Sequence, residues 1–456
     1  MFLSIQLRRT SPLHRAALIF SLWGFLNIAL ALLPPTSPPI FKNTPFAVIW
    51  NAPTDVCKRL EISLDTSAFQ AVTTPASDPD QFLFLFYSNR LGLYPYINDE
   101  TKEEFNGGIP QKGNITASLL KEVHDVTYYI PELSPGLAVI DWESWRPLWA
   151  RNWGSKEIYR KLSIQFVQEN WPSFNSSQDE ALAKEQFQNA ARAYMEQTVK
   201  LTIKMRPKYL WGYYLFPDCY NYGWDQPGYT GECPEKEIIL NGELHWLWNA
   251  STALFPSAYL PLDLRNNQSA TYFVRGRVQE AIRVSTLPKH PYTAPIYVYL
   301  RPLFRDQSVI YLSEADLIST IGESAALGAS GAILWGASAD YSTKDSCEAL
   351  AAYLPSILNP YITNVTAAAK LCSSMLCQGK GRCLRKNPQS NTYLHLNPKH
   401  FHIQGSRGKY LAIGTPSLSD ISNFVENFSC QCYAGQTCSA KMPDSLPKIP
   451  IVIRVT

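Results

Sequence analysis

The stretch GLAVIDWESWRP, residues 136–147, joins a short apolar run to two acidic residues, Asp141 and Glu143. Alternate residues of an extended strand point to the same side, so both carboxyl groups are expected on one face of a sheet and Trp142 on the other. The apolar residues and tryptophans around them penalise an ionised carboxylate. A carboxyl group so placed tends to keep its proton at neutral pH and can act as a general acid.

Asp-x-Glu is a common tripeptide pattern that by itself indicates only a solvated strand end or the start of a helix. Its setting here favours the catalytic interpretation, because an apolar run leads into the pair and Trp142, Trp145 and Trp149 lie close to it in sequence. The run is also one of several along the chain. Near-continuous apolarity is typical of parallel strands covered on both faces. Seven such strands are predicted, at residues 46–50, 82–87, 136–142, 209–216, 258–262, 295–300 and 331–335.

Helical patterns separate most of these strands. The clearest helix is predicted to begin at Ser177, where Glu180 completes a capping box, and to continue to about residue 201. Two more are expected at residues 272–284 and 313–327. This α/β alternation favours a distorted TIM-like (β/α) barrel with seven strands over an open doubly wound sheet. The chemistry of such barrels lies at the C-terminal strand ends, which is the expected place of Asp141 and Glu143.

The chain has 456 residues and 46% hydrophobic content, enough for one large core. Its 41 basic and 38 acidic residues nearly balance, so charge gives no reason to expect a nucleic-acid partner. Residues 1–35 contain a basic leader and an apolar run closed by Pro34 and Pro35, typical of a signal peptide or signal anchor. The sequence therefore predicts the secretory pathway, with possible membrane association through this segment, and no C-terminal anchor.

Ten cysteines in a chain with a secretory leader favour five disulfides over metal ligands. Six sequons agree with this route: Asn114, Asn175, Asn249, Asn267, Asn364 and Asn427. Beyond residue 366 the cysteines become dense, and their spacing resembles an epidermal-growth-factor-like (EGF-like) module with an insertion at residues 387–427. The expected divisions are residues 1–35, a barrel at 36–365, the disulfide-rich module at 366–440 and a short tail at 441–456.

Other chemistries lack their signatures. The seven histidines form no metal-binding spacing, so neither a metal nor an organic cofactor is expected. The stretch GESAA, residues 322–326, begins like a serine nucleophile elbow but lacks the closing glycine and has a helical pattern. Residues 328–331 are predicted to form a turn into the last strand rather than a phosphate-binding loop. The many tryptophans are individually typical of core positions, yet together they suit a sugar-binding cleft.

Three longer stretches carry a family resemblance: GLAVIDWESWRPLWARNW from residue 136, LWGYYLFPDCYNY from residue 210 and ILNPYITNVT from residue 357. They resemble the vertebrate hyaluronidases, glycoside hydrolase family 56, with the sperm-surface type as the most similar. The similarity extends over about residues 46–438. It implies a retaining, substrate-assisted glycosidase in which Glu143 is the general acid/base and Asp141 stabilises the acetamido group of the substrate.

The same resemblance assigns further residues. Tyr214 and Tyr259 are expected to contact the sugar near the cleaved bond, and Asp306 and Trp335 to close the same pocket. Weaker substrate-binding assignments are Asn51, Tyr87, Ser88 and Arg277, and for Arg277 a structural salt bridge is an equal alternative. The implied disulfides are Cys57–Cys347, Cys219–Cys233, Cys372–Cys383, Cys377–Cys430 and Cys432–Cys438.

The resulting expectation is a monomeric, secreted or cell-surface endo-β-N-acetylhexosaminidase, with a lysosomal or acrosomal compartment as a further option. Its expected partners are hyaluronan and, more slowly, chondroitin. Two alternatives stay open at this point. One is a hyaluronan-binding or adhesion protein that keeps the fold without cutting, and the other is a chondroitin-preferring hydrolase, against which Tyr259 argues.

Overall fold

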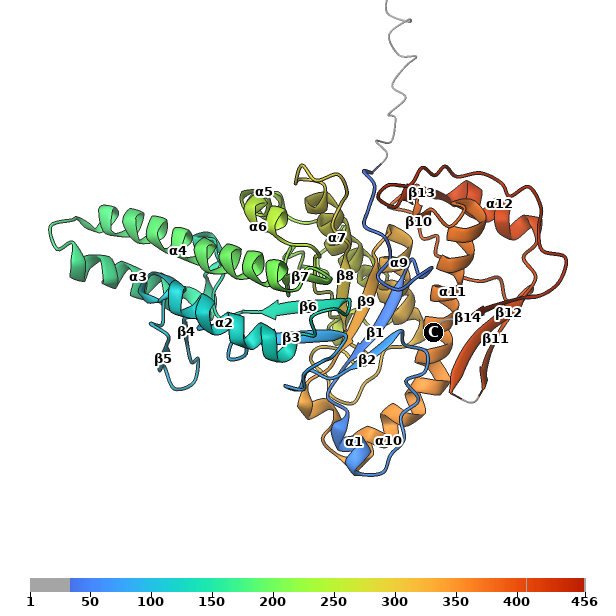
Figure 1. Ribbon diagram of the computed structural model, residues 1–456, viewed down its shortest axis with the longest axis horizontal. Helices are drawn as coiled ribbons and strands as arrows, with labels where there is room; N and C mark the ends of the chain where they lie inside the picture. The colour runs from blue at the N-terminus through green and yellow to red at the C-terminus, as the bar shows by residue number, and fades with distance from the viewer. Residues whose placement is uncertain (1–32, 407, 455–456) are drawn as a thin grey trace, which may run out of the picture. The chain divides into compact units, whose positions relative to one another are not determined.

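Parallel strands form the centre of the molecule, which a computed structural model describes for residues 33–454 except residue 407 (Figure 1). Two parallel sheets are present among the described residues. Their strand orders are β2-β1-β9-β8 and β3-β6-β7, and every neighbouring pair in them is parallel. The strands are β1 (Ala47–Asn51), β2 (Ala71–Thr73), β3 (Leu83–Tyr87), β6 (Gly136–Asp141), β7 (Tyr209–Tyr213), β8 (Tyr297–Leu300) and β9 (Gly331–Trp335). Six of the seven predicted strands are therefore confirmed.

The prediction of a strand at residues 258–262 is wrong. The chain instead approaches its neighbours slightly earlier, through isolated bridges that pair Tyr214 with Phe255, Leu254 with Ile296, and Ser257 with Tyr299. Pro256 lies among the bridging residues and has no N–H to donate, which prevents a continuous ladder. This segment joins the two sheets. Among the described strands no ladder joins β2 to β3, although these two lie next to each other.

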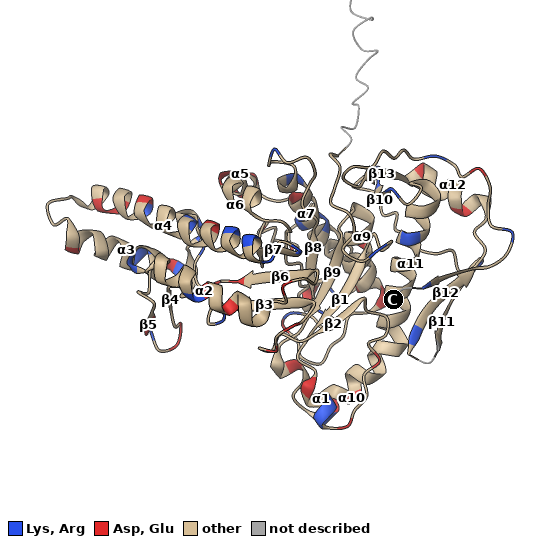
Figure 2. Ribbon diagram, in the orientation of Figure 1, with Lys and Arg blue, Asp and Glu red and all other residues tan. Residues whose placement is uncertain are grey.

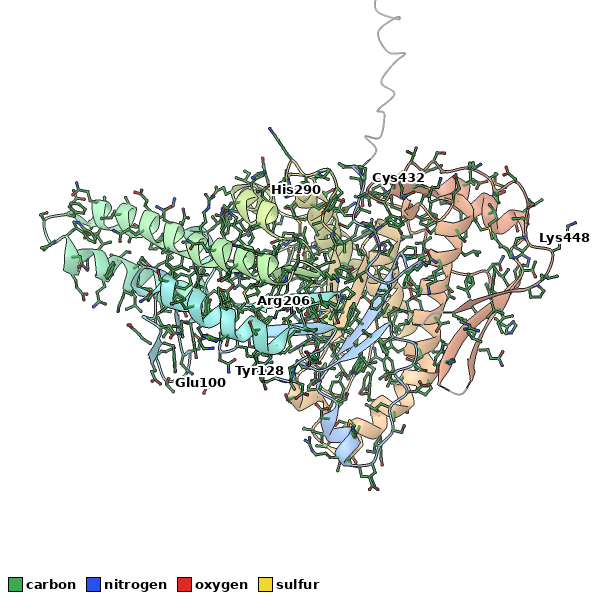
Figure 3. All side chains as sticks on the ribbon, in the orientation of Figure 1. Glu100, Tyr128, Arg206, His290, Cys432 and Lys448 are labelled. Carbon is green, nitrogen blue, oxygen red and sulfur yellow. A yellow bond between two sulfur atoms is a disulfide. The ribbon has the colours of Figure 1, made fainter. Side chains whose placement is uncertain are left out.

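Helices alternate with the strands. Those described are α1 (Asp55–Arg59), α2 (Ile115–Tyr129), α3 (Glu157–Asn170), α4 (Ser176–Met205), α5 (Glu235–Glu243), α6 (His245–Ala250), α7 (Gln268–Ser285), α8 (Glu314–Leu317), α9 (Glu323–Leu327), α10 (Lys344–Tyr353), α11 (Asn359–Leu376) and α12 (Leu418–Asn427). Figure 1 shows α2 and α4 alongside β3, β6 and β7, and α11 alongside β1. Arg206, which follows α4, donates from Nε to the Ile130 carbonyl at 2.8 Å and so ties α4 to the end of α2 (Figure 3).

The predicted start of the long helix is displaced by two residues. α4 is capped by Asn175, whose side chain accepts from the Gln178 N–H while the Gln178 side chain accepts from the Asn175 N–H. Asn caps a helix at least as well as Ser, so the earlier residue takes the position predicted for Ser177. The predicted helix at 313–327 is present with Ser313 as its cap, and a π-helical turn, Ile318–Gly322, lies between α8 and α9.

The described part of the C-terminal region contains two small antiparallel sheets. Strands β10 (Gly381–Arg385) and β13 (Phe428–Cys432) form one antiparallel pair, and β11 (Phe401–Ser406), β12 (Lys409–Gly414) and β14 (Ile451–Arg454) form an antiparallel sheet. β14 belongs to the segment expected to be a short tail. The expected boundary between residues 365 and 366 falls inside α11, which runs from the parallel sheets into this region without a break.

Five disulfides are present, with the pairing that the family resemblance implies. Cys57–Cys347 joins α1 to α10 across 290 residues of sequence. A short antiparallel pair, β4 (Tyr96–Ile97) and β5 (Glu104–Phe105), lies between β3 and α2 in sequence. Figure 2 shows acidic and basic residues interspersed along helices such as α4.

The predicted signal segment lies almost entirely outside the described residues. Within residues 33–454, apart from residue 407, no helix has the combination of length and apolar character needed to cross a membrane.

Candidate active site

The parallel strands have two apolar faces, and the candidate site continues one of them. One cluster of buried side chains, the inner cluster, takes alternate strand residues, such as Leu137 and Val139 of β6. The residues between them, such as Ala138 and Ile140, pack in the larger cluster against the helices. Because the period of a strand is two, the next inward position of β6 is Asp141.

Neighbouring strands end on equivalent inward positions. Tyr87 is the direct partner of Asp141 in the β3–β6 ladder, and Asn51 is the direct partner of Trp335 in the β1–β9 ladder. Tyr87 and Trp335 both pack on the inner cluster, and the Trp335 Nε1 donates to the Tyr87 hydroxyl at 3.3 Å. The strand register therefore brings four of the predicted site residues to one edge of the sheets, the C-terminal edge.

The two carboxyl groups face each other in different surroundings. Burial raises the pKa of Asp141 well above its ordinary value, and the charge of Glu143 and a hydrogen bond with it raise this pKa further, against the opposing effect of Arg146. Glu143 lies two residues on, with 48% of its side chain exposed. The pair thus combines a half-buried carboxyl group that favours its proton with a second one that faces solvent.

Trp142 faces the opposite way, as alternation predicts. It is buried and stacks on Tyr94 with ring centroids 4.6 Å apart. This packing against the helical layer fixes the strand end between Asp141 and Glu143, because a bulky indole locked on one side holds the two carboxyl groups on the other.

Aromatic side chains surround the pair. Tyr259 stacks on Trp335 with centroids 5.9 Å apart, and Tyr214 lies 6.3 Å from Tyr259. Burial, followed by the charge of Glu143, raises the pKa of Tyr214, so this phenol is neutral and can donate a hydrogen bond. Both tyrosines are half-buried and pack on the inner cluster. Rings in this arrangement suit the apolar faces of sugar units.

Sequence reasoning missed two cations beside Glu143. Arg146, which is buried, donates from one terminal nitrogen to the Glu143 carbonyl at 2.8 Å and places the other 3.6 Å from the Glu143 carboxylate. Lys156, which precedes α3, donates to the same carbonyl. Burial, then the charge of Arg146, lowers the pKa of Lys156 to about 8. Arg146 belongs to the same motif as Glu143, and this closeness in sequence could have indicated its role. No feature of the sequence indicated Lys156.

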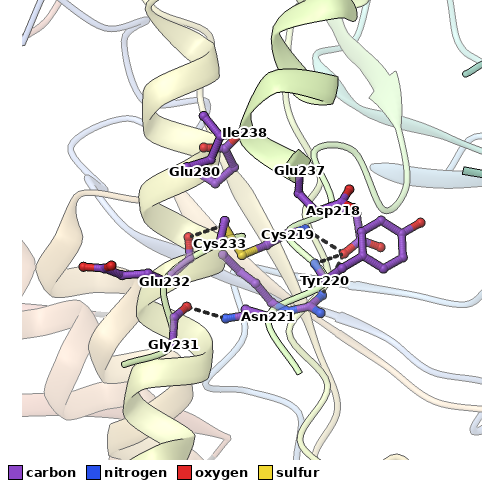
Figure 4. Close-up of a disulfide and its surroundings, with 12 residues drawn as sticks. Asp218, Cys219, Tyr220, Asn221, Gly231, Glu232, Cys233, Glu237, Ile238 and Glu280 are labelled. Carbon is purple, nitrogen blue, oxygen red and sulfur yellow. Dashed lines mark hydrogen bonds and ion pairs between the residues drawn. A yellow bond between two sulfur atoms is a disulfide. The ribbon is translucent and has the colours of Figure 1, made fainter. Parts of the chain in front are cut away.

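A third missed residue, Tyr220, lies in the segment that follows β7. Burial raises its pKa, and a hydrogen bond with Arg146 opposes this shift. Figure 4 shows the neighbouring disulfide Cys219–Cys233 and the Asp218 carboxylate, which accepts from the backbone N–H groups of Cys219 and Tyr220 at 2.7 and 3.1 Å. These contacts hold a backbone in which Tyr220 has a positive φ of 48°.

The structure places the remaining predicted residues less centrally. Arg277 is buried and pairs with Asp218 at 3.5 Å while donating to the Ser257 carbonyl at 2.8 Å, which is the salt-bridge alternative. The Ser257 hydroxyl accepts in turn from Tyr214 at 3.3 Å. Arg277 therefore contacts the residue that binds the Tyr214 hydroxyl. Asp306 is exposed in the loop after β8 and accepts from the Leu262 backbone at 3.0 Å.

Two smaller assignments complete the placement. Ser88 follows Tyr87 and is half-buried, whereas Asn51 is fully buried beside its ladder partner Trp335. Across the described residues no group of three or more His, Cys, Asp or Glu side chains is arranged to hold a metal ion.

The sequons differ in accessibility. Asn114, Asn175, Asn249 and Asn267 are exposed. Asn364 and Asn427 are half-buried, and their side chains already take part in hydrogen bonds with the Leu396 N–H and the Asn423 carbonyl. Glycan attachment at all six stays a prediction, with these two the least accessible.

Comparison with known proteins places this geometry in a family. The sequence model described as hyaluronidase matches residues 35–442. Hyaluronidase PH-20 from Homo sapiens is 45% identical over 408 residues, which cover 89% of this chain and 80% of that protein. Hyaluronidase-4 from Homo sapiens is 43% identical over 94% of this chain and 90% of that protein.

Solved structures agree with the sequence comparison. The crystal structure of bee venom hyaluronidase superimposes with a TM-score of 0.62 and 31% identity, covering 70% of this chain and 99% of that one. The same bee enzyme has also been solved in complex with a hyaluronic acid tetramer. With a family match over most of its length and relatives of more than 40% identity, this chain belongs to the hyaluronidase family of glycosidases, and within it resembles the sperm type.

Proposed function

We propose that this protein is an endo-acting hyaluronidase that hydrolyses β-1,4 N-acetylhexosaminide bonds in hyaluronan, and those of chondroitin more slowly. The observation that carries the proposal is the pairing of half-buried Asp141, whose pKa is raised, with exposed Glu143 at a strand edge lined by aromatic rings. The hyaluronic acid tetramer bound by the bee relative supports the choice of polymer.

In the proposed mechanism the nucleophile belongs to the substrate. The acetamido oxygen of the N-acetylglucosamine unit attacks its own anomeric carbon as the glycosidic C–O bond breaks, and Glu143 transfers its proton to the leaving oxygen. Asp141 orients the acetamido group and stabilises the charge that develops on it. Glu143 then takes a proton from water. The water oxygen attacks the anomeric carbon and breaks its bond to the acetamido oxygen, which restores the acetamido group. Two inversions at that carbon give net retention.

The tyrosines and Trp335 would position the sugar units for this sequence. A neutral Tyr214 hydroxyl can donate to the reacting unit, while the stacked rings of Tyr259 and Trp335 offer an apolar wall. Arg277 serves Tyr214 through Ser257 rather than by contact with the polymer.

At the level of the fold, we propose that β2 and β3 complete the ring of strands as a distorted barrel, since they lie next to each other without a ladder. The β10–β13 pair with its three disulfides is proposed as the EGF-like module. Secretion or cell-surface display is proposed from the disulfides, the sequons and the sperm-type relatives.

The deciding experiment treats hyaluronan and chondroitin side by side with purified protein between about pH 4 and 7.5, the range where a carboxyl group can act as acid. Mass spectrometry should detect even-numbered saturated oligosaccharides from hyaluronan. Unchanged chain length would refute hydrolysis, and binding without cleavage would instead identify an adhesion protein on the same fold. Faster cleavage of chondroitin would refute the substrate preference.

A further inference from the structure

The peptide that carries Glu143 lies beyond the strand ladders. The β3–β6 pairing ends at Asp141 and the β6–β7 pairing ends at Ile140, so no neighbouring strand holds the backbone of the general acid. The loop needs another restraint if the Glu143 carboxyl group is to keep one direction. A general acid acts only within hydrogen-bond reach of the atom that it protonates.

Two cationic side chains provide that restraint at a single atom. The Glu143 carbonyl oxygen accepts from Arg146 at 2.8 Å and also from the Lys156 ammonium. Lys156 makes a second, longer contact with the Ser144 carbonyl at 3.4 Å. It stands at the end of the short turn Gly154–Lys156 directly before α3, so its backbone is anchored to a helix outside the loop.

This arrangement has an electrostatic cost. Arg146 is buried, and its charge lowers the pKa of Lys156, which burial has already lowered. The charges that oppose this effect belong to Glu143 and, from the β4–β5 connection, to Asp99. Two like charges that converge on one carbonyl oxygen are unfavourable unless the hydrogen bonds they form compensate. A lysine that only covered the surface would be expected to extend into solvent instead.

We propose that Lys156 is a positioning residue for Glu143, acting through the carbonyl oxygen of that residue to fix the loop from which its carboxyl group projects. The proposal rests on the acid role of Glu143 described above. Arg146 holds the loop from within the same motif, and Lys156 holds it from α3. Loss of the second anchor should let the carboxyl group move while leaving the surface that binds the polymer in place.

The test compares Lys156→Met, which keeps the length of the side chain but cannot donate, with Lys156→Arg, which can. The matched control is Lys161→Met on α3, whose lysine is 71% exposed. Because small misplacements of a reacting group cost up to about a hundredfold in rate, K156M should lower kcat on hyaluronan by about 10- to 100-fold. KM should stay within about twofold, K156R should recover most of kcat, and K161M should match the wild type.

A structural role alone is separated by binding. Hyaluronan oligosaccharide should bind the E143Q and E143Q/K156M proteins equally well in calorimetry, and thermal unfolding of K156M should stay close to that of the wild type. If K156M fails to fold, Lys156→Leu, which also cannot donate, takes its place in the same assays.

Three results would overturn the proposal: an unchanged kcat in K156M, an effect confined to KM, which would assign Lys156 to the substrate carboxylates, or no recovery in K156R. Failure of the proposed function is distinct, since a wild-type protein inactive on hyaluronan refutes that function before any variant is made.

Discussion

Tyr87 and Asp141 are direct partners in the parallel ladder of β3 and β6, and both point to the inner face of the sheet. Burial raises the pKa of Tyr87. A hydrogen bond from Trp335 lowers this pKa and the charge of Asp141 raises it, and the net shift is an increase. The Tyr87 phenol and the Asp141 carboxyl group therefore both favour their neutral forms. Around Glu143 the strand edge is rich in groups that hold protons, which suits a site where a proton is transferred.

The first prediction concerns Glu143→Gln. The amide keeps the shape of the side chain but has no transferable proton, so turnover of hyaluronan should fall by about 10²- to 10⁴-fold. Binding of hyaluronan oligosaccharides should change little, because the amide keeps the shape of a side chain that is 48% exposed. Release of reducing ends measures turnover, and calorimetry measures binding. Full activity in this variant would show that another group is the acid.

The second prediction concerns Glu122, a fully buried residue of α2. Burial raises its pKa from 4.5 to about 9, and the Thr198 hydroxyl opposes the shift only in part. In the unfolded chain this carboxyl group ionises near pH 4.5, whereas in the folded protein it stays neutral to about pH 9. Its contribution to stability is therefore fully present below pH 4.5 and decreases as the pH rises towards 9.

Glu122→Gln removes this dependence. The free energy of unfolding of the variant relative to the wild type should be near zero at pH 4 and should increase by several kcal/mol towards pH 9. Urea titrations at a series of pH values measure the difference. Glu348→Gln, which changes a glutamate exposed on α10, should give the same difference at every pH. A flat difference for E122Q would mean that Glu122 is ionised in the folded protein.

The third prediction concerns the link between α7, α9 and β10. Glu323 is fully buried and pairs with Arg275 at 2.7 Å and with Arg385 at 2.5 Å. Glu323→Gln would leave two buried guanidinium groups without a counter-charge and should destabilise the protein by about 3 to 5 kcal/mol. Urea unfolding followed by tryptophan fluorescence measures this loss, with E348Q as the control. A change below 1 kcal/mol, the range of an exposed ion pair, would contradict it.

The fourth prediction compares two disulfides. Cys57–Cys347 spans 290 residues and Cys432–Cys438 spans 6. In the chain-entropy description, removing the first by a double serine substitution should cost about 6 kcal/mol and removing the second about 2 kcal/mol. The midpoints of urea unfolding of the two variants provide the comparison. Equal losses would indicate that local packing, rather than closure of the long loop, determines the contribution of Cys57–Cys347.

Much of the central fold could be predicted from the sequence because its strands are apolar on both faces. Such runs stand out against the helices between them, and their order led to Asp141 and Glu143 at the end of β6. The failure at residues 258–262 has a physical cause. The apolar run has the composition of a strand, but it follows Pro256 and contains Pro261, and neither proline has an N–H group to donate to a ladder. β2 has three residues and was too short to detect.

The site was predicted less completely than the fold. Residues on the strands could be assigned, since register places Asn51, Tyr87 and Trp335 beside Asp141. Lys156 could not be assigned, because its contact with Glu143 depends on how α3 begins relative to the strand end. For Arg277 the sequence offered two roles, and its ion pair with Asp218 depends on tertiary contacts that the sequence does not show.

The long separation of Cys57 and Cys347 bears on how the chain is made. A ribosome delivers Cys57 early, and Cys219 and Cys233 emerge before its partner does. If disulfides formed in the order of synthesis, Cys57 would therefore pair with Cys219 rather than with Cys347. The correct bond requires either that Cys57 is kept reduced until α10 has been translated, or that a thiol exchange catalyst later undoes the error. Yield of active protein should thus depend on the isomerase capacity of the producing cell more than on the speed of translation.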